Sequence, residues 1–85
     1  MDANEIVKKL WWEQMVALQN LKKHPDTEGS ALCKMSDMSF AELSSLGEMG
    51  LIDIGDERLL PKQLHPTLTE LGKEVLALCE SRGIV

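Results

Sequence analysis

The most constraining feature of this sequence is a segment that carries a complete signal for the start of a helix. Ser39-Phe40-Ala41-Glu42 has the S-x-x-E form of a capping box. In this motif the serine and glutamate side chains each bond a backbone N–H that the first turn leaves without a partner. Met38 and Leu43 stand at the two positions of a hydrophobic staple. These residues predict a helix that begins at Phe40.

The end of the same helix is also marked. Gly50 can adopt the left-handed backbone conformation that closes many helices, and Leu51 would then fold back onto Leu46. Because both ends are set by local sequence, a short helix with defined bounds is expected here.

A β-hairpin is expected directly after this helix. Residues 51–54 are short, partly alternating and β-branched, as strands are, and Gly55-Asp56-Glu57 supplies a turn. Residues 58–65 would form the returning strand. Pro61 would lie at an edge or in the loop, because proline has no N–H to donate to a ladder.

A helix is also expected at the start of the chain. Asp2 or Asn4 can cap it, and it should run to about Lys23 and stop at His24-Pro25. Helical periodicity gathers its core-facing apolar residues on one side, namely Ile6, Val7, Leu10, Trp11, Met15, Ala17, Leu18 and Leu21.

Two further helices complete the expected architecture of one domain over residues 1–85. Residues 30–35 are interpreted as a short helix that follows a polar link. Thr67-Leu68-Thr69-Glu70 is a second possible capping box, so the last helix is expected over residues 67–82, with Gly83 as its end. Its core face comprises Leu68, Leu71, Val75, Leu76, Leu78 and Cys79.

Two segments, taken together, resemble a known family. Residues 46–54 (LGEMGLIDI) resemble the junction where the recognition helix of MarR-like and PadR-like regulators enters the first wing strand. Residues 68–76 (LTELGKEVL) resemble the segment that follows the second wing strand. The resemblance implies a winged helix-turn-helix domain, mainly α with a small β-hairpin, in which residues 26–65 form the helix-turn-helix and wing. The alternative is a helical bundle with an irregular loop over residues 51–65.

Negative charge is concentrated in the middle of the chain. The net charge is -5, and residues 25–57 hold one lysine against eight carboxylates. Such a surface repels phosphates and favours a protein partner with a basic surface. The candidate acidic binding face comprises Asp37, Glu42, Glu48, Asp53, Asp56 and Glu57. We therefore expect a regulatory adaptor or inhibitor.

A dimeric DNA-binding transcription regulator is the alternative that the resemblance implies. In those families the third helix lies in the DNA major groove and basic side chains contact bases and phosphates. Here the groove-facing positions carry no basic side chain. The candidate DNA contacts are Lys34, Ser39, Ser44, Ser45, Arg58 and Lys62.

A homodimer is expected from the first helix. Trp12 and Val16 lie one turn apart on the side opposite the core face and form a small apolar patch. A second copy would cover this patch, as the resemblance implies, because regulators of these families dimerise through helices outside the helix-turn-helix. The alternative cover is Ile84-Val85 of the same chain.

Catalysis and metal binding are not expected. The sequence has no Gly-rich phosphate loop, no G-x-S-x-G elbow and no paired Cys/His spacing, so no catalytic residue, cofactor or metal site is predicted. Cys33 and Cys79 stand in apolar helical patterns and should be buried, reduced and structural. Without a signal peptide or an apolar run that could span a bilayer, a cytoplasmic location with no membrane contact is expected.

Overall fold

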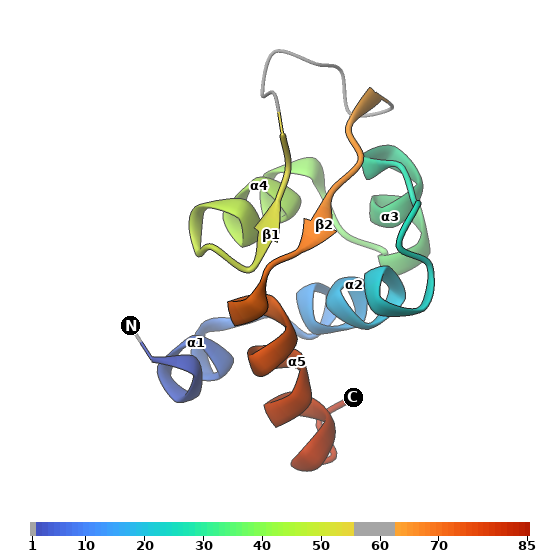
Figure 1. Ribbon diagram of the computed structural model, residues 1–85. Helices are drawn as coiled ribbons and strands as arrows, with labels where there is room; N and C mark the ends of the chain where they lie inside the picture. The colour runs from blue at the N-terminus through green and yellow to red at the C-terminus, as the bar shows by residue number, and fades with distance from the viewer. Residues whose placement is uncertain (1, 56–62) are drawn as a thin grey trace.

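The computed structural model describes residues 2–55 and 63–85. The elements in these ranges are helices α1 (Ala3–Lys9), α2 (Trp12–Lys23), α3 (Gly29–Ser36), α4 (Phe40–Glu48) and α5 (Glu70–Ser81), with strands β1 (Ile52–Asp53) and β2 (Thr67–Leu68). The strands form an antiparallel pair, with β1 beside α4, and α5 continues from β2 and packs against α1 (Figure 1). The predicted class, mainly α with a small β-hairpin, is confirmed.

Both ends of α4 lie where the sequence predicts them. The Ser39 Oγ accepts a hydrogen bond from Glu42 N at 3.2 Å, and the Glu42 carboxylate accepts one from Ser39 N at 3.2 Å. At the other end Gly50 has a φ of 77°, and Leu51 N donates to Leu46 O at 3.0 Å. The capping box and the glycine-ended last turn are therefore confirmed.

Replacing Gly50 by alanine should lower the free energy of unfolding by about 1 kcal/mol, because a Cβ is disfavoured at positive φ. A Cβ here would meet no heavy atom closer than 3.9 Å. The loss of stability would therefore come from the backbone conformation and not from a steric clash. Gly50→Asn should lose less, since asparagine tolerates this region better. Urea unfolding measures both. A Gly50→Ala curve that superimposes on the wild type would contradict the end assigned to α4.

The predicted first helix is wrong in its continuity, because the chain breaks it into α1 and α2. Leu10 and Trp11 are extended, with ψ of 138° and 153°. The buried Gln14 stabilises the break: its Oε1 accepts from Trp11 N at 3.0 Å and its Nε2 donates to Glu42 O at 3.1 Å. Trp11 was expected in the core and is instead 68% exposed, while the rest of the predicted core face is buried.

The returning strand lies later in the chain than predicted. The register of the hairpin places Ile52 opposite Leu68 and Asp53 opposite Thr67. Of the predicted range 58–65, residues 63–65 belong to no strand and residues 58–62 lie outside the described residues. Because Pro66 has no N–H to offer a ladder, the residues beyond it form the pair with β1.

Helix α5 also begins later than predicted, because Thr69 and not Thr67 is its N-cap. The Thr69 Oγ accepts from Gly72 N at 3.0 Å, and its hydroxyl donates to Gly50 O at 2.6 Å. Thr69 N donates to Leu51 O at 3.1 Å. Gly72 lies so close to Leu51 that a Cβ on it would stand 2.0 Å from Leu51 O. The end of α4 and the start of α5 thus form one hydrogen-bonded junction.

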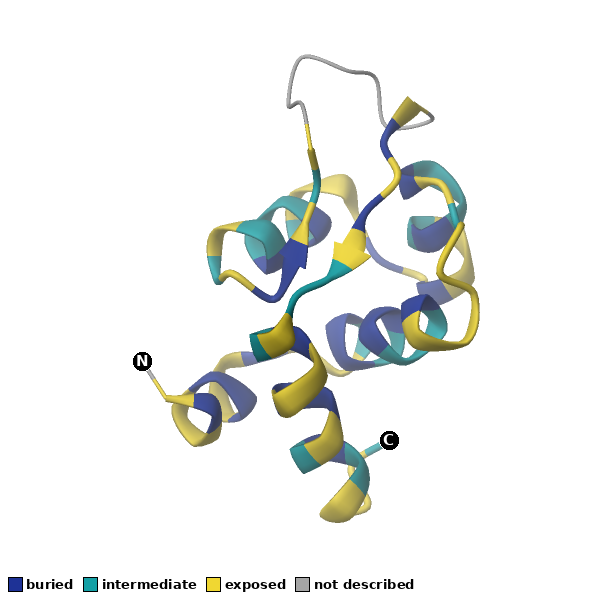
Figure 2. Cartoon of the chain, in the orientation of Figure 1, coloured by how far each residue is buried: buried dark blue, intermediate teal, exposed yellow. Residues whose placement is uncertain are grey.

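The core lies where the buried sides of the helices face one another (Figure 2). Its fully buried apolar residues include Leu18, Leu32, Leu43, Leu46, Leu51, Val75 and Cys79. On the predicted core face of the last helix Val75, Leu76 and Cys79 are buried, and the remaining residues of that face are half-buried. The C-terminal end of α5 is also as predicted, since Gly83 has a φ of 70°.

The two cysteines are free thiols in different surroundings. Cys79 is fully buried, whereas Cys33 is half-buried with its thiol 3.8 Å from Ser39 O. Burial raises the pKa of both thiols, and the Glu42 carboxylate adds to the rise at Cys33. The predicted burial is confirmed for Cys79 and only in part for Cys33.

Candidate binding face

Of the carboxylates predicted to form a binding face, the structure brings two together. Glu48 at the end of α4 and Asp53 in β1 are exposed and line the same hollow between these elements. Asp37 lies at the end of α3 with a φ of 53°, and the half-buried Glu42 is engaged in the cap of α4. The remaining two, Asp56 and Glu57, lie outside the described residues.

The hollow between α4 and β1 has a volume of about 630 Å³. Its apolar floor forms where Ile54 crosses α4 at Gly47. A Cβ on Gly47 would stand 2.6 Å from Ile54 Cδ1, so the missing side chain lets the strand approach the helix. Phe40, on the first turn of α4, also lines the hollow and is 41% exposed. The hollow is therefore open to solvent and partly apolar.

The charged side chains among the described residues of this hollow, Glu48 and Asp53, are both negative. Asp53 Oδ1 accepts a hydrogen bond from Gly55 N at 3.0 Å. Neither Asp53 nor Glu48 forms an ion pair within the residues that the structure describes. Among the described residues that line the hollow there is no lysine or arginine. Two carboxylates of the same sign beside an apolar floor attract cationic side chains.

The residues predicted for DNA contact provide little positive charge. Lys34 is exposed on α3, whereas Ser44 and Ser45 on α4 are half-buried. The Ser39 hydroxyl is engaged with Glu42 in the cap of α4. The other two candidates, Arg58 and Lys62, lie outside the described residues. Within the described part of the chain, Lys34 is the one basic residue of this set.

Trp11 and Trp12 form an exposed aromatic pair at the junction of α1 and α2, with exposed fractions of 68% and 63%. Val16, one turn after Trp12, is half-buried. Ile84 is itself 38% exposed, Val85 packs against the core, and Trp12 is left open, so the alternative cover by Ile84-Val85 does not enclose Trp12. We call Trp11, Trp12 and Val16 the tryptophan patch. Periodicity missed Trp11 because it treats α1 and α2 as one continuous helix.

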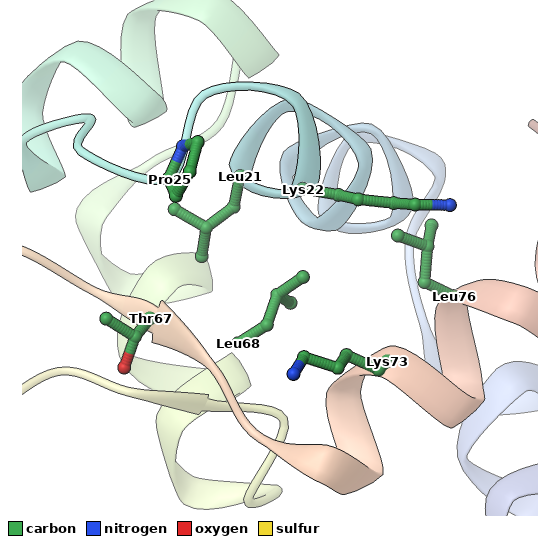
Figure 3. A pocket seen from close by; sticks show the side chains of 7 residues that line it. All are labelled: Leu21, Lys22, Pro25, Thr67, Leu68, Lys73 and Leu76. Carbon is green, nitrogen blue, oxygen red and sulfur yellow. The ribbon is translucent and has the colours of Figure 1, made fainter.

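A second hollow, of about 460 Å³, lies between the end of α2, strand β2 and the start of α5 (Figure 3). It is lined by Leu21, Lys22, Pro25, Thr67, Leu68, Lys73 and Leu76. The two lysines are paired with carboxylates, Lys22 with Glu80 at 3.1 Å and Lys73 with Glu70 at 3.2 Å. The hollow therefore has a mainly apolar lining, and the charges of both its lysines are already paired. Sequence reasoning missed this hollow because its lining comes from three separate segments.

Residues 2–55 and 63–85 contain neither of two other kinds of site. No helix there is long and apolar enough to cross a membrane. No group of three His, Cys, Asp or Glu side chains in these ranges is placed to hold a metal ion.

Comparison with solved structures identifies the architecture. The chain is similar to Staphylococcus aureus MarR, solved in complex with salicylate and kanamycin, with a TM-score of 0.68 and 21% identity over 88% of this chain. It spans 55% of the length of that protein. No protein-family model matches the chain, and no curated protein matches it in sequence. The structural likeness establishes the winged-helix fold that the two sequence segments predicted, and it excludes the helical bundle with an irregular loop.

Proposed function

We propose that this chain is a non-catalytic, regulatory winged-helix module that binds another protein through the acidic face formed by Glu48 and Asp53. The observation that carries the proposal is the composition of α4, whose residues include two carboxylates and no basic side chain. The partner would present a basic surface, because lysine and arginine side chains satisfy carboxylates that lack ion pairs. The MarR neighbour supports a regulatory role at the level of the fold alone.

The same charges argue against DNA as the main partner. Binding to duplex DNA draws most of its free energy from lysine and arginine side chains that neutralise phosphates. In the α4–β1 region the exposed charged groups are Glu48 and Asp53, which would be repelled by the backbone of a duplex. The basic side chains of a protein partner would instead be attracted by these two carboxylates.

Titration of the chain with mixed-sequence duplex DNA at several salt concentrations tests this choice. We expect no binding even at low salt. The double variant Glu48→Lys with Asp53→Lys should acquire weak binding whose affinity falls with salt, by a log–log slope of about 0.9 for each phosphate neutralised. This variant shows that the assay detects such contacts. Tight, strongly salt-dependent binding by the wild type would instead support the DNA-binding regulator, with Ser44, Ser45 and the wing as its reading surface.

We also infer that a second copy covers the tryptophan patch, which makes the module a homodimer. The support is the exposure of Trp11 and Trp12, since large aromatic side chains are seldom left open on a monomer surface. In a two-fold dimer the same patch serves both copies, and Trp12 of one copy lies near Trp12 or Val16 of the other.

A further inference from the structure

We propose that the hollow between α4 and β1 seats a basic, amphipathic segment of the partner protein. One large apolar side chain of that segment packs on Phe40 and Ile54, and lysine or arginine side chains beside it pair with Glu48 and Asp53. This inference rests on the proposed function, and it adds the chemistry of the segment that is recognised.

The apolar half of the proposal comes from Phe40 and the floor of the hollow. Phe40 is the first residue of α4 and leaves 41% of its surface in water, although its neighbours Met38 and Leu43 are buried. Beside it, Ile54 packs on the backbone of α4 at Gly47. An apolar side chain placed between Phe40 and Ile54 gains burial on both sides, as the central anchor of an interface does.

Two carboxylates, one from each element that borders the hollow, provide its charge. Glu48 belongs to α4 and Asp53 to β1, so a chain that lies between the two elements passes both. Neither is paired within the described residues. A basic side chain therefore gains an ion pair without breaking one that the described residues form, and the apolar surroundings strengthen the new pair relative to a fully exposed one.

A basic segment of another protein fits this hollow better than nucleic acid does. DNA would bring phosphates to two carboxylates and offers no flexible apolar side chain for Phe40. Within the described chain itself, the segment from Lys8 to Trp12 joins two lysines to two exposed tryptophans and has a related chemistry. A second copy is therefore an outcome that the test must separate.

The test uses three fluorescein-labelled probes of equal net charge, measured by fluorescence anisotropy. The first is an amphipathic peptide made of two LKKLLKL repeats, the second has the same composition in scrambled order, and the third is an oligolysine. We expect the amphipathic peptide to bind roughly tenfold more tightly than the oligolysine, because the oligolysine has no apolar side chain to act as the anchor. A mixed-sequence duplex DNA is the fourth probe.

Three variants locate the binding on the molecule. Glu48→Lys should lower the affinity for the amphipathic peptide by roughly tenfold. Phe40→Ala should lower the affinity for the amphipathic peptide by roughly fivefold and leave the affinity for the oligolysine unchanged. Glu74→Lys makes the same charge change at an exposed position on α5 and should alter either affinity by about twofold at most. A thermal scan by circular dichroism establishes that each variant is folded, and Glu48→Gln replaces Glu48→Lys if the latter is not.

The outcomes separate the two proposals. If all basic probes bind equally and Phe40→Ala has no effect on their affinities, the proposed acidic binding face is supported. The proposal that an apolar side chain binds between Phe40 and Ile54 is then overturned. If no basic probe binds, or only the DNA does, both proposals are overturned. Sedimentation of the Glu48→Lys variant tests whether a second copy of this chain occupies the hollow. If the wild type is a dimer and this variant is a monomer, a second copy lies in the hollow, and the proposal of a separate partner protein is overturned.

Discussion

Gly72→Ala is expected to lower the free energy of unfolding by about 3 kcal/mol, which is a large share of the roughly 4–13 kcal/mol that a domain of this size possesses. A Cβ at this position would stand 2.0 Å from Leu51 O and 3.3 Å from a methyl group of Leu68. The first of these atoms belongs to the backbone that accepts the hydrogen bond of Thr69 N, so it cannot turn aside. The start of α5 must instead move away from the end of α4.

The measurement is thermal unfolding, where this loss corresponds to a fall of about 15 °C in Tm. Gly47→Ala is the matched control, because it also adds a methyl group to a helical glycine. Its Cβ meets the terminal methyl of Ile54 at 2.6 Å, and a side chain can rotate away. Helix propensity alone predicts that both changes stabilise by about 0.5–1 kcal/mol. A Gly72→Ala protein at least as stable as the wild type would show that the junction is looser than described.

Trp12→Glu is expected to convert a homodimer into a folded monomer. At the exposed fractions found here, Trp11 and Trp12 leave roughly 300 Å² of surface per copy to be covered. Stable interfaces bury about 1,200 Å² or more in total, so the tryptophan patch would be the centre of a wider seam. A carboxylate forced into that centre loses its hydration without gaining a cationic partner, which should weaken the dimer by roughly a hundredfold.

The fold itself should survive this change. Trp12 is the first residue of α2, and a carboxylate is favoured at a helix N-terminus. Phe40→Glu is the matched control, since it places the same charge on an exposed aromatic at the first position of α4 and should leave the dimer intact. Sedimentation velocity at high micromolar concentration measures the oligomeric state of the wild type and of both variants. A wild-type chain that is already monomeric there would rule out the dimer.

The parts of the fold that could be predicted are those whose causes are local. The capping box at Ser39 and the glycine end at Gly50 place all their hydrogen-bonding groups within a few residues, and α4 has the predicted bounds. The break at Trp11 depends on Gln14, whose amide also bonds the carbonyl of Glu42, 28 residues away. The late position of β2 depends on its pairing with β1. Neither long-range contact has a signal in helical periodicity.

The candidate site also has a part that the sequence predicts and a part that depends on contacts between distant segments. Charge counting places Glu48 and Asp53 in an acidic region of the sequence, and the structure puts them around one hollow. The apolar floor was not predictable, because it arises where Ile54 meets a glycine on another element. The two segments that resemble winged-helix regulators, residues 46–54 and 68–76, stand apart in the sequence. In the structure they meet, with Thr69 bonded to Gly50 and Gly72 against Leu51.

The separation of α1 from α2 has a consequence for the order in which the molecule assembles. Helix α1 packs on α5, and Arg82 bonds the side chain of Asn4, 78 residues earlier. Closing so large a loop has an entropic cost, and contacts between residues so far apart in the sequence slow folding. The ribosome completes α1 before α5 exists, so Ile6 and Val7 lack the surface of α5 while the intervening residues are made. Within the described chain, α1 is therefore made before the helix on which it packs, and its apolar side stays open until α5 is made.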